Sequence, residues 1–108
     1  MPQLVAYRNP NPNPRTKSQF PLLLDIQSDL LDDLTTTVVI PLSPETLLKG
    51  AAMTKLNPVI EIEDVRYAAV TQQLAGIERR LLGEAIEVDL SCFRGEVIAA
   101  LDFLISGI

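Results

Sequence analysis

The sequence contains no histidine, no tryptophan and a single cysteine, Cys92. Without histidine, the chain lacks the commonest general base and the commonest side-chain metal ligand of proteins. A lone cysteine without histidine also excludes the usual thiol nucleophile pair and the familiar zinc-binding spacings. The five glycines are scattered, so no glycine-rich loop is available to bind phosphate groups. These absences argue against an enzyme, and we expect no catalytic residue, no metal site and no cofactor.

Long apolar runs are also lacking. The longest uninterrupted apolar stretches are far shorter than the roughly twenty residues that a membrane-spanning helix needs. The start of the chain does not combine a basic segment, an apolar segment and a small-residue cleavage site, so we expect no signal peptide. Cys92 cannot form an internal disulfide, which suits a reducing compartment. We therefore expect a cytoplasmic protein with no membrane association, folded as a single domain over residues 1–108.

Basic residues are few and unevenly distributed, and the formal net charge is −5. Of the nine Lys and Arg residues, three lie within residues 1–24, which contain no acid, and six share residues 25–108 with all fourteen acids. A predominantly acidic body without a stripe of Lys and Arg binds nucleic-acid phosphates poorly. We expect any contact with nucleic acid to be indirect, through a partner protein.

Five or six short apolar or alternating segments predict β-strands. Their residue ranges are 3–7, 20–27, 36–42, 58–63, 65–71 and 76–82. The fourth range alternates isoleucine with glutamate, and Asp64 marks the hairpin turn that follows it. Pro41 is expected to end the third strand, since proline cannot donate to a strand ladder. Arg79 and Arg80 in the last range predict a solvated sheet edge.

Two connections between these strands have a distinctive composition. Residues 9–14 are three Asn-Pro pairs that run into Arg15–Ser18. This segment suits neither a strand ladder nor a helix and predicts a long solvated hairpin loop. Residues 28–33 (SDLLDD) surround Leu30 and Leu31 with capping residues and acids. This pattern predicts a tight turn or one helical turn that exposes both leucines. The acids here and at 61–64 lack the spacing of a calcium loop, and their simplest interpretation is a solvated surface.

Residues 91–108 predict a C-terminal α-helix. Apolar residues recur at the spacing of one helix face, at Val97, Ile98, Leu101, Leu104, Ile105 and Ile108. Ser91 is expected to cap the N-terminus of this helix, and Gly107 to end it in a left-handed conformation. Two interpretations are open: the helix packs into the core and simply stops, or its tip is a binding element.

Short strands followed by one helix predict an α+β fold, in which a small antiparallel sheet or barrel is closed by the helix. The apolar helix face adds hydrophobic surface that one small domain does not readily cover. We therefore expect a homodimer.

The block Leu24–Asp32 has the sequence LDIQSDLLD and is followed at a short distance by Val39–Leu42 (VIPL). Together these blocks resemble the signature region of the CcdB family of toxins. Asn57–Ile62 (NPVIEI), Val70–Gln73 (VTQQ) and the terminal helix follow in the same order. The resemblance extends from Gln3 to the end of the sequence. It implies an SH3-like barrel of five or more antiparallel strands with a C-terminal helix, acting as a two-fold homodimer.

The resemblance also implies a function. Members of this family are toxins of type II toxin–antitoxin systems, which bind the A subunit of DNA gyrase and trap the enzyme on cleaved DNA, so that topoisomerase activity is lost. A cognate, CcdA-like antitoxin neutralises the toxin, and their complex represses transcription of its own operon.

Carried over by position, the gyrase contact would be made by Ser106, Gly107 and Ile108. Asp102, one helical turn earlier, and the Leu30–Leu31 turn would line the same surface. Ser106 departs from the family pattern, because the best-known member has tryptophan there, and an aromatic residue is a natural anchor of a protein interface. Either other groups build the contact or gyrase binding is weaker.

Two alternative functions differ from gyrase poisoning. A ribonuclease toxin on a related barrel would need an acid–base set and a basic RNA groove, and the sequence offers neither. A toxin-fold module that binds antitoxin but has lost its gyrase target is the other alternative, which Ser106 suggests.

Overall fold

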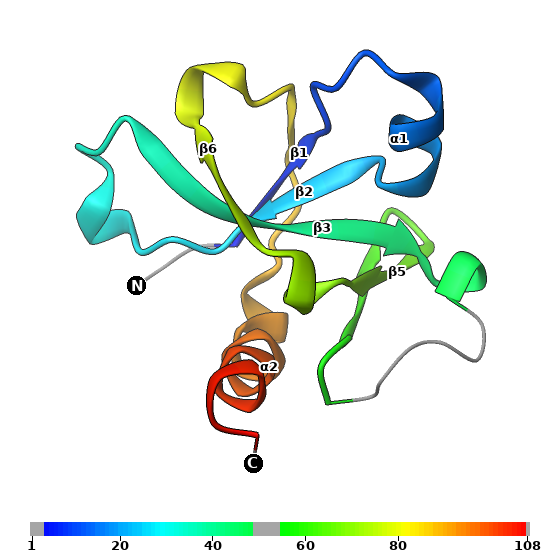
Figure 1. Cartoon of the computed structure of the whole chain (residues 1–108), viewed down its shortest axis with the longest axis vertical. Helices are drawn as coiled ribbons and strands as arrows, with labels where there is room; N and C mark the ends of the chain where they lie inside the picture. Colours follow the sequence, from blue (N-terminus) through cyan, green and yellow to red (C-terminus); the bar gives the residue numbers. More distant parts are fainter. Residues whose placement is uncertain (1–3, 49–54, 108) are drawn as a thin grey trace.

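The computed structural model describes residues 4–48 and 55–107 of the chain (Figure 1). Within these residues seven β-strands and two α-helices are joined by short 3-10 turns. The strands are β1 (Val5–Arg8), β2 (Leu22–Asp25), β3 (Thr36–Pro44), β4 (Val59–Ile62), β5 (Val65–Ala69), β6 (Ala75–Glu78) and β7 (Ala85–Ile86). The helices are α1 (Pro14–Gln19) and α2 (Arg94–Ser106). No helix in the described part of the chain is long and apolar enough to cross a membrane.

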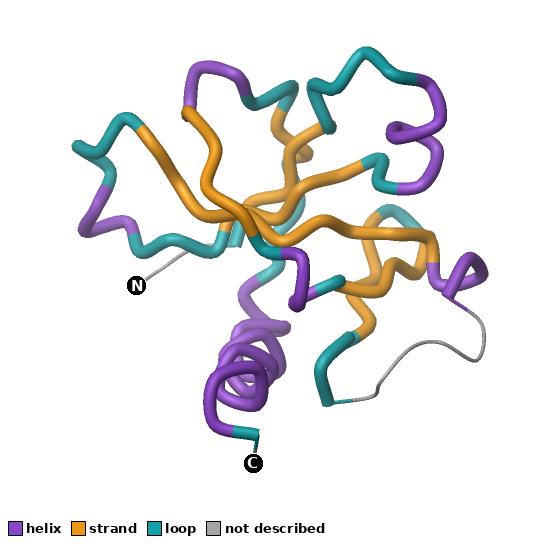
Figure 2. Tube along the Cα trace, in the orientation of Figure 1, coloured by secondary structure: helices purple, strands orange, loops and turns teal. Residues whose placement is uncertain are grey.

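All strand pairs are antiparallel and are arranged around β3. The order along the sheet is β4-β5-β3-β2-β1-β7, with β6 also paired to β3. One edge of β3 pairs with β2, while its other edge pairs with β6 over Thr36–Val39 and with β5 over Leu42–Pro44. Because β5 and β6 leave the same edge in different directions, the sheet curls (Figure 2). This curled sheet with a C-terminal helix is the α+β, barrel-like fold that the sequence predicts.

β3 runs through Pro41, contrary to the expectation that this residue ends the strand. Pro41 lies opposite Leu23 of β2, and its carbonyl oxygen accepts a hydrogen bond from the backbone N–H of Val70 at 2.9 Å. In an antiparallel ladder, the N–H and C=O of one residue point to the same neighbour. The missing N–H of Pro41 therefore faces the gap between the β6 and β5 pairings, where no ladder donor is needed.

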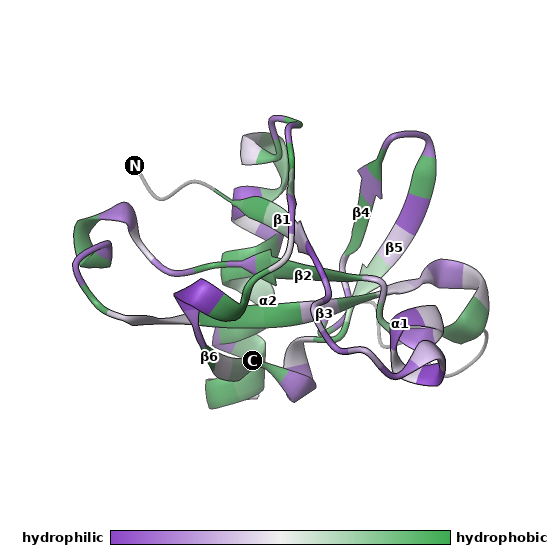
Figure 3. Ribbon diagram, turned by 90° about the horizontal axis from the view of Figure 1, so that it is seen from above, coloured by the Kyte–Doolittle hydropathy of each residue, from purple (hydrophilic) through white to green (hydrophobic). Residues whose placement is uncertain are grey.

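The hydrophobic core lies against β2 and β3, which Figure 3 shows as largely hydrophobic ribbon. Leu24, Ile40, Leu42 and Ile60 are completely or almost completely removed from solvent. Each such side chain contributes roughly 1.5–3 kcal/mol to folding through burial of its apolar surface. Since all four residues of β2 are buried, this strand is covered on both faces.

The Asn-Pro segment is more ordered than the loop that the sequence predicts. The side-chain oxygens of Asn9, Asn11 and Asn13 each accept the backbone N–H two residues further on, at 2.9 Å. Asn13 is also the N-cap of α1, and Pro14 occupies the first helical position, where its missing N–H costs nothing. The expectation of a loop without a helix is therefore wrong from Pro14 onward.

The second half of the sheet follows the sequence more closely. The hairpin of β4 and β5 is confirmed, and Glu63 and Asp64 both adopt positive φ angles of 51° and 68° at its turn. The last predicted strand is shorter than expected, since β6 ends at Glu78 and a 3-10 turn follows over Arg79–Leu81. The two-residue strand β7 was not predicted, because so short a segment carries no periodicity.

Gly83, two residues before β7, lies close to the backbone of Arg8 at the end of β1. Its N–H donates to the carbonyl oxygen of Arg8 at 3.2 Å, and a Cβ atom at this position would clash with that oxygen. We expect Gly83→Ala to lower the free energy of unfolding by about 1–3 kcal/mol. Urea denaturation measures this change.

The matched control is Gly95→Ala in α2, where an added Cβ meets no atom within 4 Å. It should leave stability unchanged or raise it by up to about 1 kcal/mol. Equal losses in the two variants would contradict the proposed clash at Gly83.

Candidate protein-binding site

The helix α2 begins later than the sequence predicts. A 3-10 turn over Ser91–Phe93 precedes it, and the first α-helical residue is Arg94. Ser91 is not the N-cap. Instead, its backbone N–H donates to a carboxylate oxygen of Asp89 at 2.9 Å. Hydrogen bonds from the side chain and the backbone of Ser91 lower the pKa of Asp89, because they stabilise the charged carboxylate.

The two halves of α2 have different surroundings. Val97 and Ala100 in the first half are buried, and Phe93 and Leu101 pack against the same core. Beyond Leu101 every residue of the helix is exposed except Phe103, which is partly buried. The first half therefore contributes the buried residues of the helix, and the second half is mostly exposed.

The buried face of α2 is only partly the predicted apolar stripe. Val97 is buried as expected, but Ile98 and Leu104 are about two-fifths exposed and Ile105 is 84% exposed. Ala100, which is not part of the predicted stripe, is completely buried. The helix is rotated so that residues 93, 97, 100 and 101 meet the core, and the sequence spacing alone does not fix this rotation.

The end of α2 has a well-defined geometry. Gly107 has φ 76° and ψ 16°, and its N–H donates to the carbonyl oxygen of Phe103 at 2.8 Å, which confirms the predicted left-handed stop. The hydroxyl of Ser106 donates to the carbonyl oxygen of Asp102 at 2.7 Å. The one hydrogen atom of this hydroxyl is thus donated within the helix and not to a partner. Ile108, the last predicted site residue, lies outside the described residues.

The Leu30–Leu31 turn has the structure that the sequence predicts. Residues Asp29–Leu31 form a single 3-10 turn (η1), and the hydroxyl of Ser28 caps it by accepting the N–H of Leu30 at 3.2 Å. Leu30 is 91% exposed and Leu31 is about half exposed. An exposed leucine on a capped turn is a small apolar surface that a partner protein can bury.

The predicted site residues do not form one patch within a single chain. Figures 1 and 3 both place the η1 turn and the C-terminal end of α2 at separate parts of the molecule. The structure brings Asp102, Ser106 and Gly107 together on the helix tip, with Ile105 beside them. A partner that contacts both the turn and the tip must span this separation, or two copies of the chain must bring them together.

Ile105 belongs to the predicted apolar stripe of the helix, and its exposure makes it a candidate site residue that the sequence analysis does not single out. Its spacing from Leu101 and Ile98 is the spacing of a buried helix face. The rotation of the helix against the core decides that Ile105 is exposed, as it does for Ile98 on the same face, and a local pattern does not contain that information.

The sequence predicts a solvated edge for both Arg79 and Arg80, and the structure bears this out only for Arg80. Arg80 is exposed and pairs with Glu78 at 2.9 Å, as expected of a solvated edge. The side chain of Arg79, however, is only 27% exposed and pairs with Asp25 at 3.6 Å and with Asp32 at 3.7 Å. The available signal was Asp25, a carboxylate at the end of a buried strand, which requires a compensating charge or hydrogen bonds.

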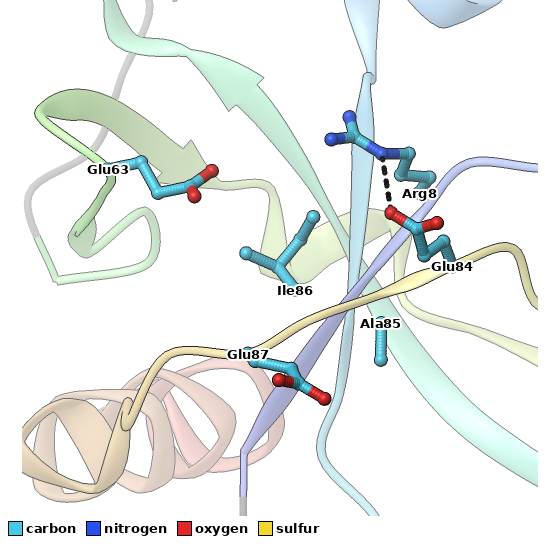
Figure 4. A pocket seen from close by; sticks show the side chains of 6 residues that line it. All are labelled: Arg8, Glu63, Glu84, Ala85, Ile86 and Glu87. Carbon is cyan, nitrogen blue, oxygen red and sulfur yellow. Dashed lines mark ion pairs between the residues drawn. The ribbon is translucent and has the colours of Figure 1, made fainter.

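A surface depression of about 440 Å³ lies beside β7 (Figure 4). Figure 4 shows Glu63 from the β4–β5 turn facing Ile86, and Arg8 paired with Glu84 at 3.7 Å. The remaining lining residues are Ala85 and Glu87. No group of three or more acidic, Cys or His side chains in residues 4–48 and 55–107 is arranged to hold a metal ion. The depression is an open, mainly acidic part of the surface.

Comparison with protein families gives a match over nearly the whole chain. The family described as CcdB protein matches residues 3–107. This range includes both the η1 turn and the tip of α2, so the two exposed apolar elements belong to the matched region.

The division of α2 into two halves predicts different costs of truncating its side chains. We expect Val97→Ala to lower the free energy of unfolding by about 2 kcal/mol, because it leaves a cavity in the core. Ile105→Ala should change it by less than about 0.5 kcal/mol, because its side chain is already in solvent. Urea denaturation of the two variants tests this difference. Similar losses would show that the second half of α2 is also packed.

Proposed function

The chain belongs to the CcdB family of toxins of toxin–antitoxin systems, and from this premise we propose that it poisons DNA gyrase. It binds the A subunit of gyrase and traps the complex of the enzyme with cleaved DNA, so that topoisomerase activity is inhibited. A cognate antitoxin neutralises it, and the toxin–antitoxin complex represses its own transcription. The protein would meet all of these partners in the cytoplasm, and we propose that it acts there. The observation that carries the proposal is the family match over residues 3–107.

The exposed apolar side chains support a contact with a protein partner. Leu30 on the η1 turn is 91% exposed and Ile105 near the tip of α2 is 84% exposed, the two highest values among the large apolar residues that the structure describes. When a partner buries aliphatic side chains in such positions, the complex is stabilised by roughly 25 cal/mol per Å² of apolar surface removed from water. The sequence has no stripe of Lys and Arg residues that would bind nucleic acid.

The helix tip is the first part of the proposed gyrase contact. It consists of Asp102, Ser106, Gly107 and Ile108, the residues that the family resemblance assigns. Ser106 is a weak anchor, because its hydroxyl donates to its own helix. We propose that Ile105 supplies the apolar contact that an aromatic residue makes elsewhere in the family. Its side chain is exposed immediately beside Ser106.

The Leu30–Leu31 turn is the second part of the contact, and a homodimer is the arrangement that joins the two parts. In one chain the turn and the tip are separate (Figure 1). A two-fold dimer presents each of them twice, so a symmetric target such as gyrase meets two equivalent contacts. The half-exposed Ile98 and Leu104 of α2 are apolar surface available to the second copy.

A supercoiled-plasmid assay tests this function. Purified protein is incubated with gyrase, ATP and plasmid, and the reaction is stopped with detergent to reveal cleaved DNA. We expect linear DNA to accumulate, and to disappear when Gly107 and Ile108 are deleted. Absence of linear DNA with a folded protein would contradict gyrase poisoning and favour a module that binds only its antitoxin.

The same assay tests the role of Ile105. Ile105→Glu places a charge in the proposed contact and should reduce linear DNA about 30-fold or more, as expected for loss of at least about 2 kcal/mol at a central interface residue. Leu47→Glu is the matched control, because Leu47 is an exposed leucine (57%) outside the proposed contact. Equal activity of the two variants would remove Ile105 from the contact.

A further inference from the structure

The loop between β2 and β3 presents Leu30 without hydrophobic support of its own. Every side chain from Asp29 to Thr36 is exposed, and the η1 turn contains no buried residue. Three hydrogen bonds inside the loop define its turns: the N–H of Leu31 donates to Ser28, that of Asp32 to Asp29 and that of Leu34 to Leu31. These bonds shape the turn but do not attach it to the rest of the protein.

Arg79, which lies outside the loop, attaches it to the rest of the protein at three points. The backbone N–H of Arg79 donates to the carbonyl oxygen of Thr35 at 2.9 Å, and its Nε donates to that of Leu34 at 3.0 Å. The same guanidinium lies 3.7 Å from a carboxylate oxygen of Asp32. At the base of the loop, the side chain of Gln27 adds a hydrogen bond to the carbonyl oxygen of Thr36 at 3.2 Å.

Arg79 is itself fixed by a buried carboxylate. Its guanidinium lies 3.6 Å from one oxygen of Asp25, a residue that is only 7% exposed. The other oxygen of Asp25 accepts the hydroxyl of Thr37 at 2.7 Å and the N–H of Gln27 at 3.1 Å. Burial of Asp25 limits screening by solvent, and the planar guanidinium can satisfy several acceptors at once. The core strand β2 is thereby connected through Arg79 to the exposed loop.

We infer that Arg79 is a positioning residue for partner binding, which holds the η1 turn so that Leu30 is presented in one place. This inference rests on the proposed function, because the partner of Leu30 is taken to be the gyrase A subunit. We call the contacts of the Arg79 guanidinium with Asp25, Asp32 and Leu34 the clamp. Without the clamp, the turn would keep its connections to β2 and β3, the side-chain bond of Gln27 and the backbone bond from Arg79 to Thr35. The turn would then be more mobile in the free protein, and the conformational freedom that it loses on binding would weaken the affinity.

The clamp is tested first in the free protein, by nitrogen-15 relaxation. We expect the backbone order parameters at Leu30 and Leu31 to be near those of rigid backbone, about 0.85, and to fall below about 0.6 in Arg79→Ala. Arg79→Lys should not restore them, since an ammonium group cannot replace the fork of hydrogen bonds. Arg80→Ala is the matched control and should leave them unchanged. Order parameters that are unchanged in Arg79→Ala would overturn the clamp, whatever the partner is.

A double-mutant cycle then tests whether the clamp acts through Leu30. The affinity for the gyrase A subunit is measured for Arg79→Ala, for Leu30→Ala and for the double variant. We expect Arg79→Ala to weaken binding about tenfold in the parent protein, which corresponds to about 1.4 kcal/mol, and less than about twofold in the Leu30→Ala background.

The possible outcomes of the cycle separate the two proposals. Equal losses in both backgrounds would overturn the positioning role and assign Arg79 a direct contact or a general effect on stability. If the parent protein does not bind the gyrase A subunit, the proposed target and the positioning role both fail. The relaxation data still decide whether the clamp exists.

Discussion

The pairing of β3 on both edges is the constraint on which the rest of the structure depends. A nine-residue strand is long enough to hold β2 along one edge and to divide its other edge between β6 and β5. This division forces the sheet to curl, and Pro41 falls where the two pairings separate. The curled sheet creates a covered core, and that core receives only the first half of α2.

Both elements proposed to bind gyrase follow from this arrangement. Because the buried face of α2 ends near Leu101 and is turned away from Ile105, the last turn of the helix exposes Ile105 and the Gly107 stop. Because β2 and β3 separate beyond Asp25, their connection becomes an exposed loop that carries Leu30. The loop keeps its position through a polar connection to β2, whereas the helix keeps its position through apolar packing. The two elements should therefore respond differently to mutation.

Features set by local chemistry could be predicted from the sequence. The β-branched run of β3, the alternation in β4, the capped turn at Leu30 and the glycine stop at Gly107 all depend on neighbours a few residues apart. The helix α1 is not predicted although its cap is local. Proline disfavours a helix at most positions, but Pro14 occupies the first helical position, where proline is favourable.

Features set by distant partners could not be predicted. Whether Ile105 is buried depends on how α2 is rotated against the core, and the role of Arg79 depends on Asp25, which lies more than fifty residues earlier. The strand β7 exists because Gly83 lets the chain approach β1 closely, and no periodicity in two residues reports this. Each of these features requires the three-dimensional arrangement of the strands around β3.

The central claim is that the η1 turn and the tip of α2 bind the same partner. Methyl-labelled protein titrated with the gyrase A subunit would test it most directly, because each leucine and isoleucine methyl group reports its own surroundings. We predict that the signals of Leu30 and Ile105 broaden or shift together, while those of the exposed control Leu47 remain unchanged. Changes at only one of the two elements, or at neither, would contradict this claim.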